Sequence, residues 1–188
     1  MTTARRLHYS YADYLSALEM SPVKLEYCDG EIYAMAGGTP THAQLSAVTI
    51  RLLGAALLGR CDVYSSDLKL RIDATDLFTF PDATVICGER ALSALDRNSV
   101  TNPSVVVEVT SKSTEDYDRS EKLSHYQQCP SLEAVLFVSH RRAQVTVVSR
   151  TPSGWDHVEY RAGQHVVLDS PRLSFAVNDL YAGISLDG

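Results

Sequence analysis

The sequence predicts an α/β fold in which a mixed central β-sheet is flanked by helices. Strand-like and helix-like segments alternate along the 188 residues, an order typical of layered α/β folds. Residues 82–87 and 104–109 are apolar on both faces, as expected of central strands covered by helices on both sides. The chain has no internal repeat, low-complexity tract or long linker, so we expect one domain over residues 1–188.

The N-terminal part of the chain predicts a helix followed by a β-hairpin. Ser10 is a suitable N-cap for a short helix over Tyr11 to Glu19. The hairpin runs over residues 24–28 and 31–35 and turns at Asp29-Gly30. In this register Glu26 and Glu31 share one face, whereas the apolar residues Leu25, Tyr27, Ile32 and Ala34 line the other, which we expect to face the core.

A long amphipathic helix follows, from about Thr41 to Leu58, with an apolar stripe at helical spacing. The preceding Gly37-Gly38 lacks the spacing and the lysine of a phosphate-binding loop, so it indicates a hinge. Further strands are expected at residues 62–64, 68–72, 82–87, 104–109, 134–138, 144–149, 157–160 and 166–168. Ser113 and Asp116 resemble a capping box that starts a helix ending before Pro130, and a short helix is expected at residues 178–182.

Composition is ordinary for a soluble globular protein, with 45% apolar and 21% charged residues. No apolar run approaches the roughly 20 residues that span a bilayer, and the first residues do not form a signal-peptide core. We therefore expect a cytoplasmic protein with no membrane partner. The net charge of −6 is not that of a general nucleic-acid binder, although metal ions and local basic groups can offset it in a nuclease.

The four cysteines are widely spaced and form neither a C-x-x-C pair nor a zinc-type cluster with histidine. Cys61 and Cys87 lie in apolar, strand-like segments, and Cys129 precedes a proline. Buried, reduced thiols are the expectation for this pattern.

Two carboxylates occupy positions where burial is costly. Asp82 opens one apolar strand, and Glu108 lies inside Val105-Val106-Val107-Glu108-Val109. One interpretation is structural: Asp82 is a turn residue, and Glu108 pairs with an arginine. The other is a site for Mg²⁺ or Mn²⁺, because hard cations take one or two carboxylates together with water and phosphate oxygens. If the two strands are adjacent and parallel, we expect these acids to meet at one edge of the sheet.

Lys122 is the candidate cation of this site. It lies four residues after Asp118 and four before Tyr126, so the three share one helix face. This helix follows the strand of Glu108, so Lys122 can lean back over the end of the strand. The alternative is an exposed ion pair with Asp118, and Lys112 in the connecting loop is a competing candidate.

These residues, taken in order, resemble the Uma-two family of putative restriction endonucleases of the PD-(D/E)XK nuclease superfamily. The resemblance runs from Tyr11 to about Val148. The matching segments are Glu26-Tyr27-Cys28-Asp29-Gly30-Glu31, His42, Ser66-Asp67, Phe80-Pro81-Asp82-Ala83, Val106 to Ser111, and Asp118 with Lys122 and Tyr126.

The resemblance implies a restriction-endonuclease-like core in which Asp82 and Glu108 are metal ligands. The usual lysine two residues after the second acid is Thr110 here, and the family's helix-borne lysine corresponds to Lys122. Glu26, Glu31, Asp67 and His42 are possible supporting residues, together with Asp118 and Tyr126. A hairpin turn, a strand start and a helix cap are the simpler roles of Glu31, Asp67 and His42.

Our first hypothesis is a Mg²⁺- or Mn²⁺-dependent DNA endonuclease, with catalysis by Asp82, Glu108 and Lys122. The second is a non-catalytic nucleic-acid- or protein-binding module on the same scaffold, which the acidic net charge and displaced lysine favour. The third is a metal enzyme that acts on a substrate other than DNA. By analogy with nucleases that cut both strands, we expect a homodimer.

Overall fold

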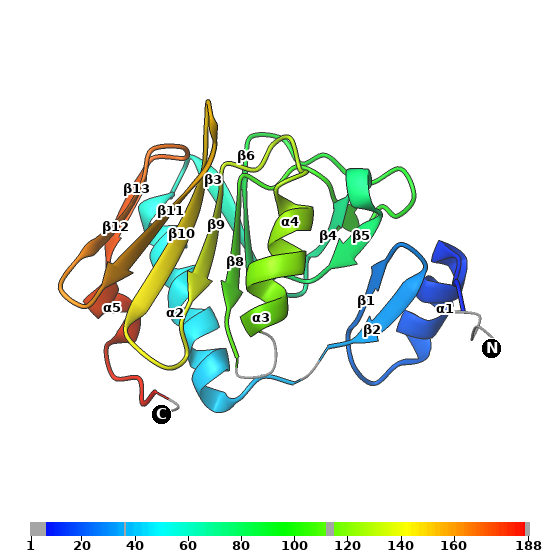
Figure 1. Ribbon diagram of the computed structural model, residues 1–188, viewed down its shortest axis with the longest axis horizontal. Coiled ribbons are helices and arrows are strands. Elements are labelled where there is room, and N and C mark those ends of the chain that lie inside the picture. Colours follow the sequence, from blue (N-terminus) through cyan, green and yellow to red (C-terminus); the bar gives the residue numbers. More distant parts are fainter. Residues whose placement is uncertain (1–6, 36, 112–114, 187–188) are drawn as a thin grey trace, which may run out of the picture.

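A six-stranded mixed β-sheet forms the centre of the computed structural model, which describes residues 7–35, 37–111 and 115–186 (Figure 1). Its strand order is β11-β10-β9-β8-β6-β3. The β8–β9 pair is parallel, and the other neighbours are antiparallel. The strands are β3 (Cys61–Ser65), β6 (Ala83–Cys87), β8 (Val105–Val109), β9 (Ala134–Val138), β10 (Gln144–Thr151) and β11 (Gly154–Arg161).

Two smaller sheets complete the strand content. A five-stranded sheet has the order β2-β1-β5-β4-β7, and a two-stranded sheet joins β12 to β13. Their strands are β1 (Leu25–Cys28), β2 (Glu31–Ala34), β4 (Lys69–Ile72), β5 (Leu77–Thr79), β7 (Ser99–Val100), β12 (His165–Leu168) and β13 (Leu173–Ala176). The predicted strands all occur, but β5, β7 and β13, of three, two and four residues, were not predicted.

The helices lie where the sequence predicted them, except that the predicted helix after β8 is divided into several short segments. The helical elements are α1 (Tyr11–Met20), α2 (Pro40–Ala56), η1 (Asp73–Thr75), α3 (Glu115–Tyr117), the π-helical segment η2 (Asp118–Lys122), α4 (Leu123–Tyr126) and α5 (Val177–Tyr181). Ser10 caps α1 in a capping box with Asp13, as predicted. The proposed cap at Ser113 lies outside the described residues. No helix in the described ranges is long and apolar enough to cross a membrane.

Both faces of the central sheet are buried. On one face, Leu45, Leu53 and Leu57 of the long helix region pack with the inward residues of β8, β9 and β10 and with α5. On the other, Leu123 and Tyr126 of α4 pack with Ile86, Val106 and Phe137, together with apolar residues of the five-stranded sheet. The prediction that residues 82–87 and 104–109 are central strands is confirmed.

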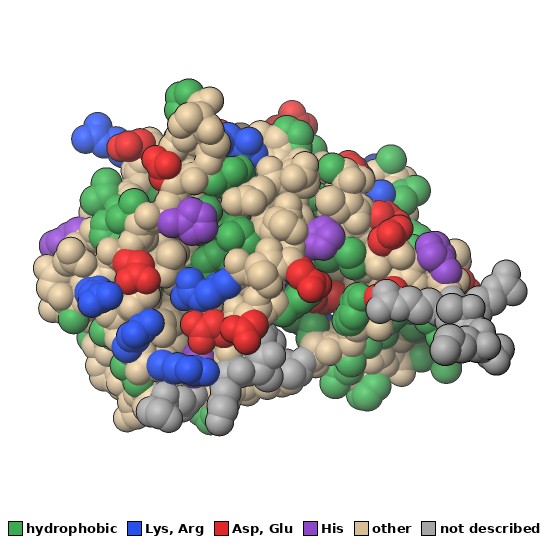
Figure 2. Space-filling model, viewed as in Figure 1, with side chains coloured by type: hydrophobic (Ala, Val, Ile, Leu, Met, Phe, Trp, Pro, Cys, Tyr) green, Lys and Arg blue, Asp and Glu red, His purple; other side chains and the backbone are tan. Residues whose placement is uncertain are grey.

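The elements α1, β1 and β2, which we call the N-terminal lobe, lie to one side of the molecule (Figure 1). Tyr14, Tyr27 and Phe78 are buried in an aromatic cluster that joins α1 to β1 and β5. On the face shown in Figure 2, the surface is indented where the lobe meets the rest of the molecule. The lobe is therefore packed on β5 through this aromatic cluster and meets the rest of the protein along a seam.

The strands that carry Asp82 and Glu108 are adjacent, but they run antiparallel rather than parallel as expected. Ala83 pairs with Val107 in the register. Asp82, just before Ala83, and Glu108, just after Val107, therefore lie at the same end of the sheet. In an antiparallel pair the start of one strand lies beside the end of the other, so both residues come to this end although the strands run in opposite directions.

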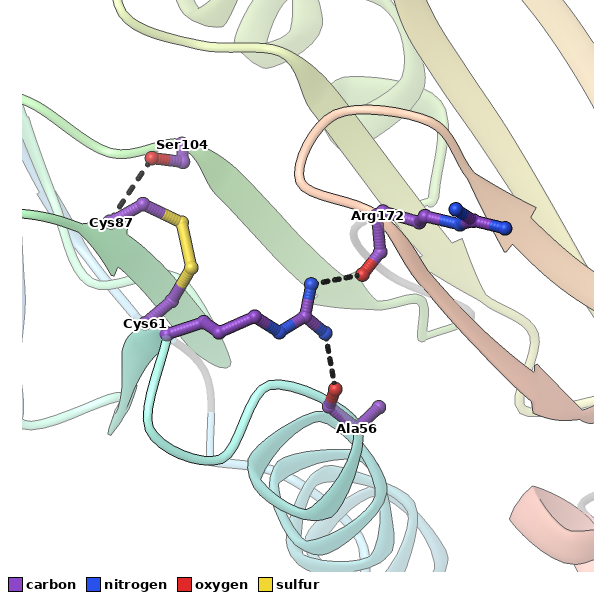
Figure 3. Close-up of a disulfide and its surroundings, with 6 residues drawn as sticks. Ala56, Cys61, Cys87, Ser104 and Arg172 are labelled. Atoms are coloured by element: carbon purple, nitrogen blue, oxygen red, sulfur yellow. Dashed lines mark hydrogen bonds between the residues drawn. A yellow bond between two sulfur atoms is a disulfide. The ribbon is translucent and has the colours of Figure 1, made fainter.

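Two of the four cysteines form a disulfide, which corrects the expectation of reduced thiols. Cys61 in β3 and Cys87 in β6 are direct partners in the antiparallel register, and their Cα atoms are 4.2 Å apart (Figure 3). Neighbouring Arg60 links the end of the long helix to the loop before β13, because its guanidinium donates to the carbonyls of Ala56 and Arg172. Sequence spacing alone does not reveal such a cross-strand pair.

The packing of α2 predicts a large difference between two leucines near its C-terminal end. Leu53 is fully buried against the sheet, whereas Leu58 is 84% exposed. We expect Leu53→Ala to lower the free energy of unfolding by about 2–5 kcal/mol in urea denaturation, because it leaves a cavity. The control Leu58→Ala is expected to change it by less than about 0.5 kcal/mol. Equal losses in the two variants would contradict this packing.

Candidate active site

The carboxylate of Glu108 is buried in the core, with 4% of the residue exposed. The other residues of β8 are valines, and strand alternation places Glu108 on the face that α4 covers. Its Oε1 atom accepts hydrogen bonds from the hydroxyl of Tyr126 and from the ammonium of Lys122, the latter at 3.0 Å. The partner of Glu108 is thus Lys122, and not the arginine that the structural interpretation of the sequence suggested.

Lys122 ends the π-helical segment between α3 and α4. In a π turn each hydrogen bond spans one residue more than in an α turn, and such insertions are frequent at functional sites. The Lys122 residue is only 3% exposed, and Asp118 four positions earlier is also buried. These burials contradict the alternative of an exposed ion pair on the helix surface.

Glu26 of β1 is the second acceptor for Lys122. Its Oε1 atom lies 3.0 Å from Nζ of Lys122 and also accepts a hydrogen bond from the hydroxyl of Thr79. The predicted hairpin register is confirmed, since Glu26 pairs with Tyr33 and Cys28 with Glu31. Glu26 is buried, although its register partner Tyr33 on the same face is exposed. In the sequence, Glu26 alternates with Leu25 and Tyr27 as in an ordinary half-exposed strand, so its burial was not predicted. Nothing in the sequence pointed to Thr79.

Asp82 lies immediately before β6 and is held from the side of α2. Its Oδ2 atom accepts a 2.7 Å hydrogen bond from the backbone N–H of Val109 and lies 3.3 Å from Nε2 of His42. The hydroxyl of Ser46 donates to Oδ1 at 3.3 Å. His42 occupies the first turn of α2, which Thr39 caps. The structure therefore brings Asp82 and His42 together at the end of β8.

Burial and neighbouring charge strongly shift the pKa values in this cluster. Burial raises the pKa of Glu108 to about 8, and the carboxylates of Asp118 and Asp82 add to the increase, while Lys122 opposes it. Burial by itself lowers the pKa of Lys122, but Glu108, Tyr126 and Glu26 outweigh it and hold this pKa well above its usual value. The hydrogen bond to Asp82 raises the pKa of His42. Around Lys122 the buried carboxylates of Glu26, Glu108 and Asp118 thus outnumber the single cation.

The remaining predicted residues divide between the cluster and the surface. Tyr126 is fully buried against Glu108, and the charge of Asp118 acts on both Glu108 and Lys122. Glu31 lies beside the hairpin turn, where it accepts a hydrogen bond from Tyr33. Asp67 has an 87% exposed side chain and pairs with Lys24 at 2.9 Å. The structure therefore places Asp118 and Tyr126 in the cluster, and Asp67 outside it.

Thr110 occupies the position of the missing superfamily lysine. It is buried, and its hydroxyl contacts the carbonyl of Val138 and Nδ1 of His140, so it has no charge to offer. The competing candidate Lys112 lies outside the described residues. Among the described lysines, Lys122 contacts Glu108.

The donor set suits a hard divalent cation. Within the described ranges, no three His, Cys, Asp or Glu side chains form a ready-made metal site. Mg²⁺, however, keeps several waters and commonly binds proteins through only one or two carboxylates. The carboxylates of Asp82 and Glu108, which come from neighbouring strands at one end of the sheet, are candidate ligands of this kind. An excess of buried negative charge also favours the arrival of a cation.

Comparison with known proteins places this arrangement in a family. The model of the Uma2 family, described as putative restriction endonuclease, matches residues 11–179. This chain belongs to the Uma2 family. Its fold is that of a restriction-endonuclease-like protein: it superimposes with a TM-score of 0.76 on a crystal structure described as a putative nuclease belonging to DUF820 from Anabaena variabilis. That match covers 93% of this chain and 98% of the other at 14% sequence identity.

Two cyanobacterial relatives share the sequence over most of its length. Uncharacterized protein slr1290 of Synechocystis is 38% identical over 178 residues, which cover 92% of this chain and 91% of the relative. Uncharacterized protein sll1609 of the same organism is 32% identical over 128 residues, or 68% of this chain and 72% of the relative. The resemblance seen in the sequence is confirmed as family membership.

The raised pKa of Glu108 predicts a pH-dependent stability. Folding raises the pKa from its ordinary 4.5 to about 8, so the folded state keeps a proton that the unfolded state releases. The stabilising contribution is therefore complete below pH 4.5 and is lost as the pH rises to about 8. We expect the free energy of unfolding to fall over this range, by up to about 1.4 kcal/mol per pH unit from this group.

Urea denaturation at several pH values measures this effect. Glu108→Gln is expected to remove the decline, whereas the control Glu89→Gln, at an exposed position, is expected to retain it. Identical pH profiles for wild type and Glu108→Gln would show that Glu108 does not hold the extra proton.

Proposed function

We propose that this protein is a divalent-metal-dependent DNA endonuclease that hydrolyses phosphodiester bonds. The observation that carries the proposal is the cluster at one end of the central sheet. There Glu108 and Lys122 are buried in direct contact, and Asp82 precedes the neighbouring strand at the same end of the sheet. Membership of a family described as putative restriction endonuclease supports the choice of nucleic acid as substrate.

In this proposal, Asp82 and Glu108 would hold Mg²⁺ or Mn²⁺. The bound cation would polarise the scissile phosphate and lower the pKa of a bound water. His42 and the N–H of Val109 fix the orientation of the Asp82 carboxylate through their contacts with Oδ2. Tyr126 fixes that of Glu108 by donating its hydroxyl proton to Oε1. The chain's own contacts therefore preorganise both acids.

Lys122 supplies a positive charge for the phosphate or for the attacking water. Its Nζ atom contacts Oε1 of Glu108 and Oε1 of Glu26, each at 3.0 Å. With a divalent cation bound at Glu108, the contact with Glu26 would keep Lys122 in the site. Preorganised cations near a developing negative charge are a major source of rate enhancement in phosphoryl transfer. Glu26 is a positioning residue in this scheme.

We expect purified protein to cut DNA only with a divalent metal. The assay uses supercoiled and linear DNA of mixed sequence with Mg²⁺, Mn²⁺ or EDTA. Asp82→Asn, Glu108→Gln and Lys122→Met are each expected to lose about 100-fold or more in rate, because each removes a ligand or the cation of the site. The control Asp67→Asn is expected to cut at the wild-type rate, since Asp67 is exposed and distant from the cluster.

Circular dichroism of each variant separates loss of chemistry from loss of fold. Metal-dependent cutting that survives both Asp82→Asn and Glu108→Gln would overturn the proposed site. Tight DNA binding without cutting under any of these conditions would instead support the binding-module alternative, which the net charge of −6 and the displaced lysine favour.

Metal binding is also expected to release a proton at pH 7. With its pKa raised to about 8, Glu108 is mostly protonated at that pH and must lose its proton to become a ligand. Isothermal titration of Mn²⁺ in buffers of different ionisation enthalpy counts the protons released, and we expect close to one. Glu108→Gln is expected to release none, whereas Asp67→Asn matches wild type. Mn²⁺ uptake without proton release by the wild type would contradict this role.

A further inference from the structure

The outer strand of the central sheet, β11, has one edge that no other strand of the described residues pairs with (Figure 1). On its other side β11 pairs with β10 along all of its eight residues, Gly154–Arg161, and the register runs without a bulge. Natural proteins protect long edge strands with lysine, proline, a bulge or a covering segment. The sequence of β11 contains neither lysine nor proline. This edge is therefore a long, regular template for pairing with another strand.

The hydrogen bonds around β11 show which of its backbone groups face outward. Just after the strand, the N–H of Ala162 donates to the carbonyl of Ala143 at 3.2 Å, which continues the pairing with β10. Because the bonding direction alternates from residue to residue in an antiparallel pair, Val158 is also directed toward β10, whereas His157 and Glu159 direct their N–H and C=O groups outward. The outward backbone groups at the centre of the strand therefore belong to the residues with polar side chains.

The side chains at the centre of β11 are exposed. His157 and Glu159 lie on one face of the sheet, because they are two residues apart, and Val158 lies on the other face with 46% of its surface exposed. The Oε2 atom of Glu159 pairs with Arg161 of its own strand at 3.2 Å. An exposed ion pair of this kind contributes little, so it does not hold the carboxylate in place. The strand thus presents a basic, an apolar and an acidic side chain in succession.

This succession is self-complementary in one antiparallel register. When two copies of β11 pair about a two-fold axis at Val158, His157 of each copy lies directly opposite the partner's Glu159, and the two valines face each other. The outward N–H and C=O groups of His157 and Glu159 meet in the same register, as a hydrogen-bonded pair requires. An axis at Glu159 would place two carboxylates directly opposite, which is destabilising, and an axis at His157 would place two imidazoles opposite. Charge therefore selects the register centred on Val158.

We propose that two copies of this chain form a homodimer in which their β11 strands pair antiparallel, with the two-fold axis at Val158. The two central sheets then become one continuous sheet. The N–H of Arg161 donates to the side chain of Gln164, so the backbone hydrogen bonds of the interface come from the region of His157 and Glu159. The strands β9 and β10 separate β11 from β8, so the interface lies apart from the candidate active site. The proposal therefore does not depend on nuclease activity.

Sedimentation velocity over a range of protein concentrations measures the dimer. We expect the wild-type protein to show a dimer fraction that increases with concentration. His157→Glu is expected to raise the dissociation constant of the dimer by about tenfold or more, because it places two acids directly opposite on both sides of the axis. The double variant, His157→Glu with Glu159→His, again places an acid opposite a base, so its dissociation constant is expected to return to within about threefold of the wild-type value.

Two further variants separate the edge of β11 from the rest of the molecule. Glu159→Pro removes an outward N–H, which an edge strand tolerates, and is expected to abolish the dimer while circular dichroism shows a retained fold. His8→Glu makes the same charge change at an exposed residue before α1, and is expected to keep the wild-type dissociation constant. A wild-type protein that is monomeric at every concentration, a dimer that survives both His157→Glu and Glu159→Pro, or a folded double variant that does not recover would each overturn the proposal.

Discussion

Lys122 places an ammonium group between two buried carboxylates, and several parts of the structure depend on this contact. Glu108 comes from the centre of the main sheet, Glu26 from the N-terminal hairpin, and Lys122 from the π-helical segment, with both N–O distances at 3.0 Å. The contact therefore joins the N-terminal hairpin to the central sheet and to the helical segment that follows β8. Since removing one partner of a buried ion pair leaves an uncompensated charge, it also constrains which residues these positions tolerate.

Stability alone is a weak explanation for this cluster. Buried ion pairs lose much of their attraction to desolvation, and apolar residues of similar volume often stabilise a protein as well or better. Here Glu26, Glu108 and Asp118 are buried near one lysine, so negative charge is in excess. The excess is met either by a proton, as the raised pKa of Glu108 indicates, or by a divalent cation. This is the physical basis for interpreting the cluster as a metal-dependent site.

Local patterns were enough to predict most of the elements. The Asp29-Gly30 turn predicted the hairpin, and the valines around Glu108 predicted a buried strand with an unusual acid. Long-range facts were not predictable from one sequence. The antiparallel pairing of β6 with β8 and the disulfide between Cys61 and Cys87 both depend on how distant strands align. Sequence reasoning ranked Glu26 low for the same reason, because its burial comes from a helix about 100 residues away.

The most direct test of this account is a thermodynamic cycle on the buried contact. Lys122→Met, Glu108→Gln and the double variant are compared by urea denaturation at neutral pH. The account predicts that Lys122→Met lowers the free energy of unfolding by about 3–5 kcal/mol, and that the double variant loses at least about 1 kcal/mol less than the sum of the single losses. Strictly additive losses would show that Lys122 and Glu108 do not interact, and would contradict the central claim.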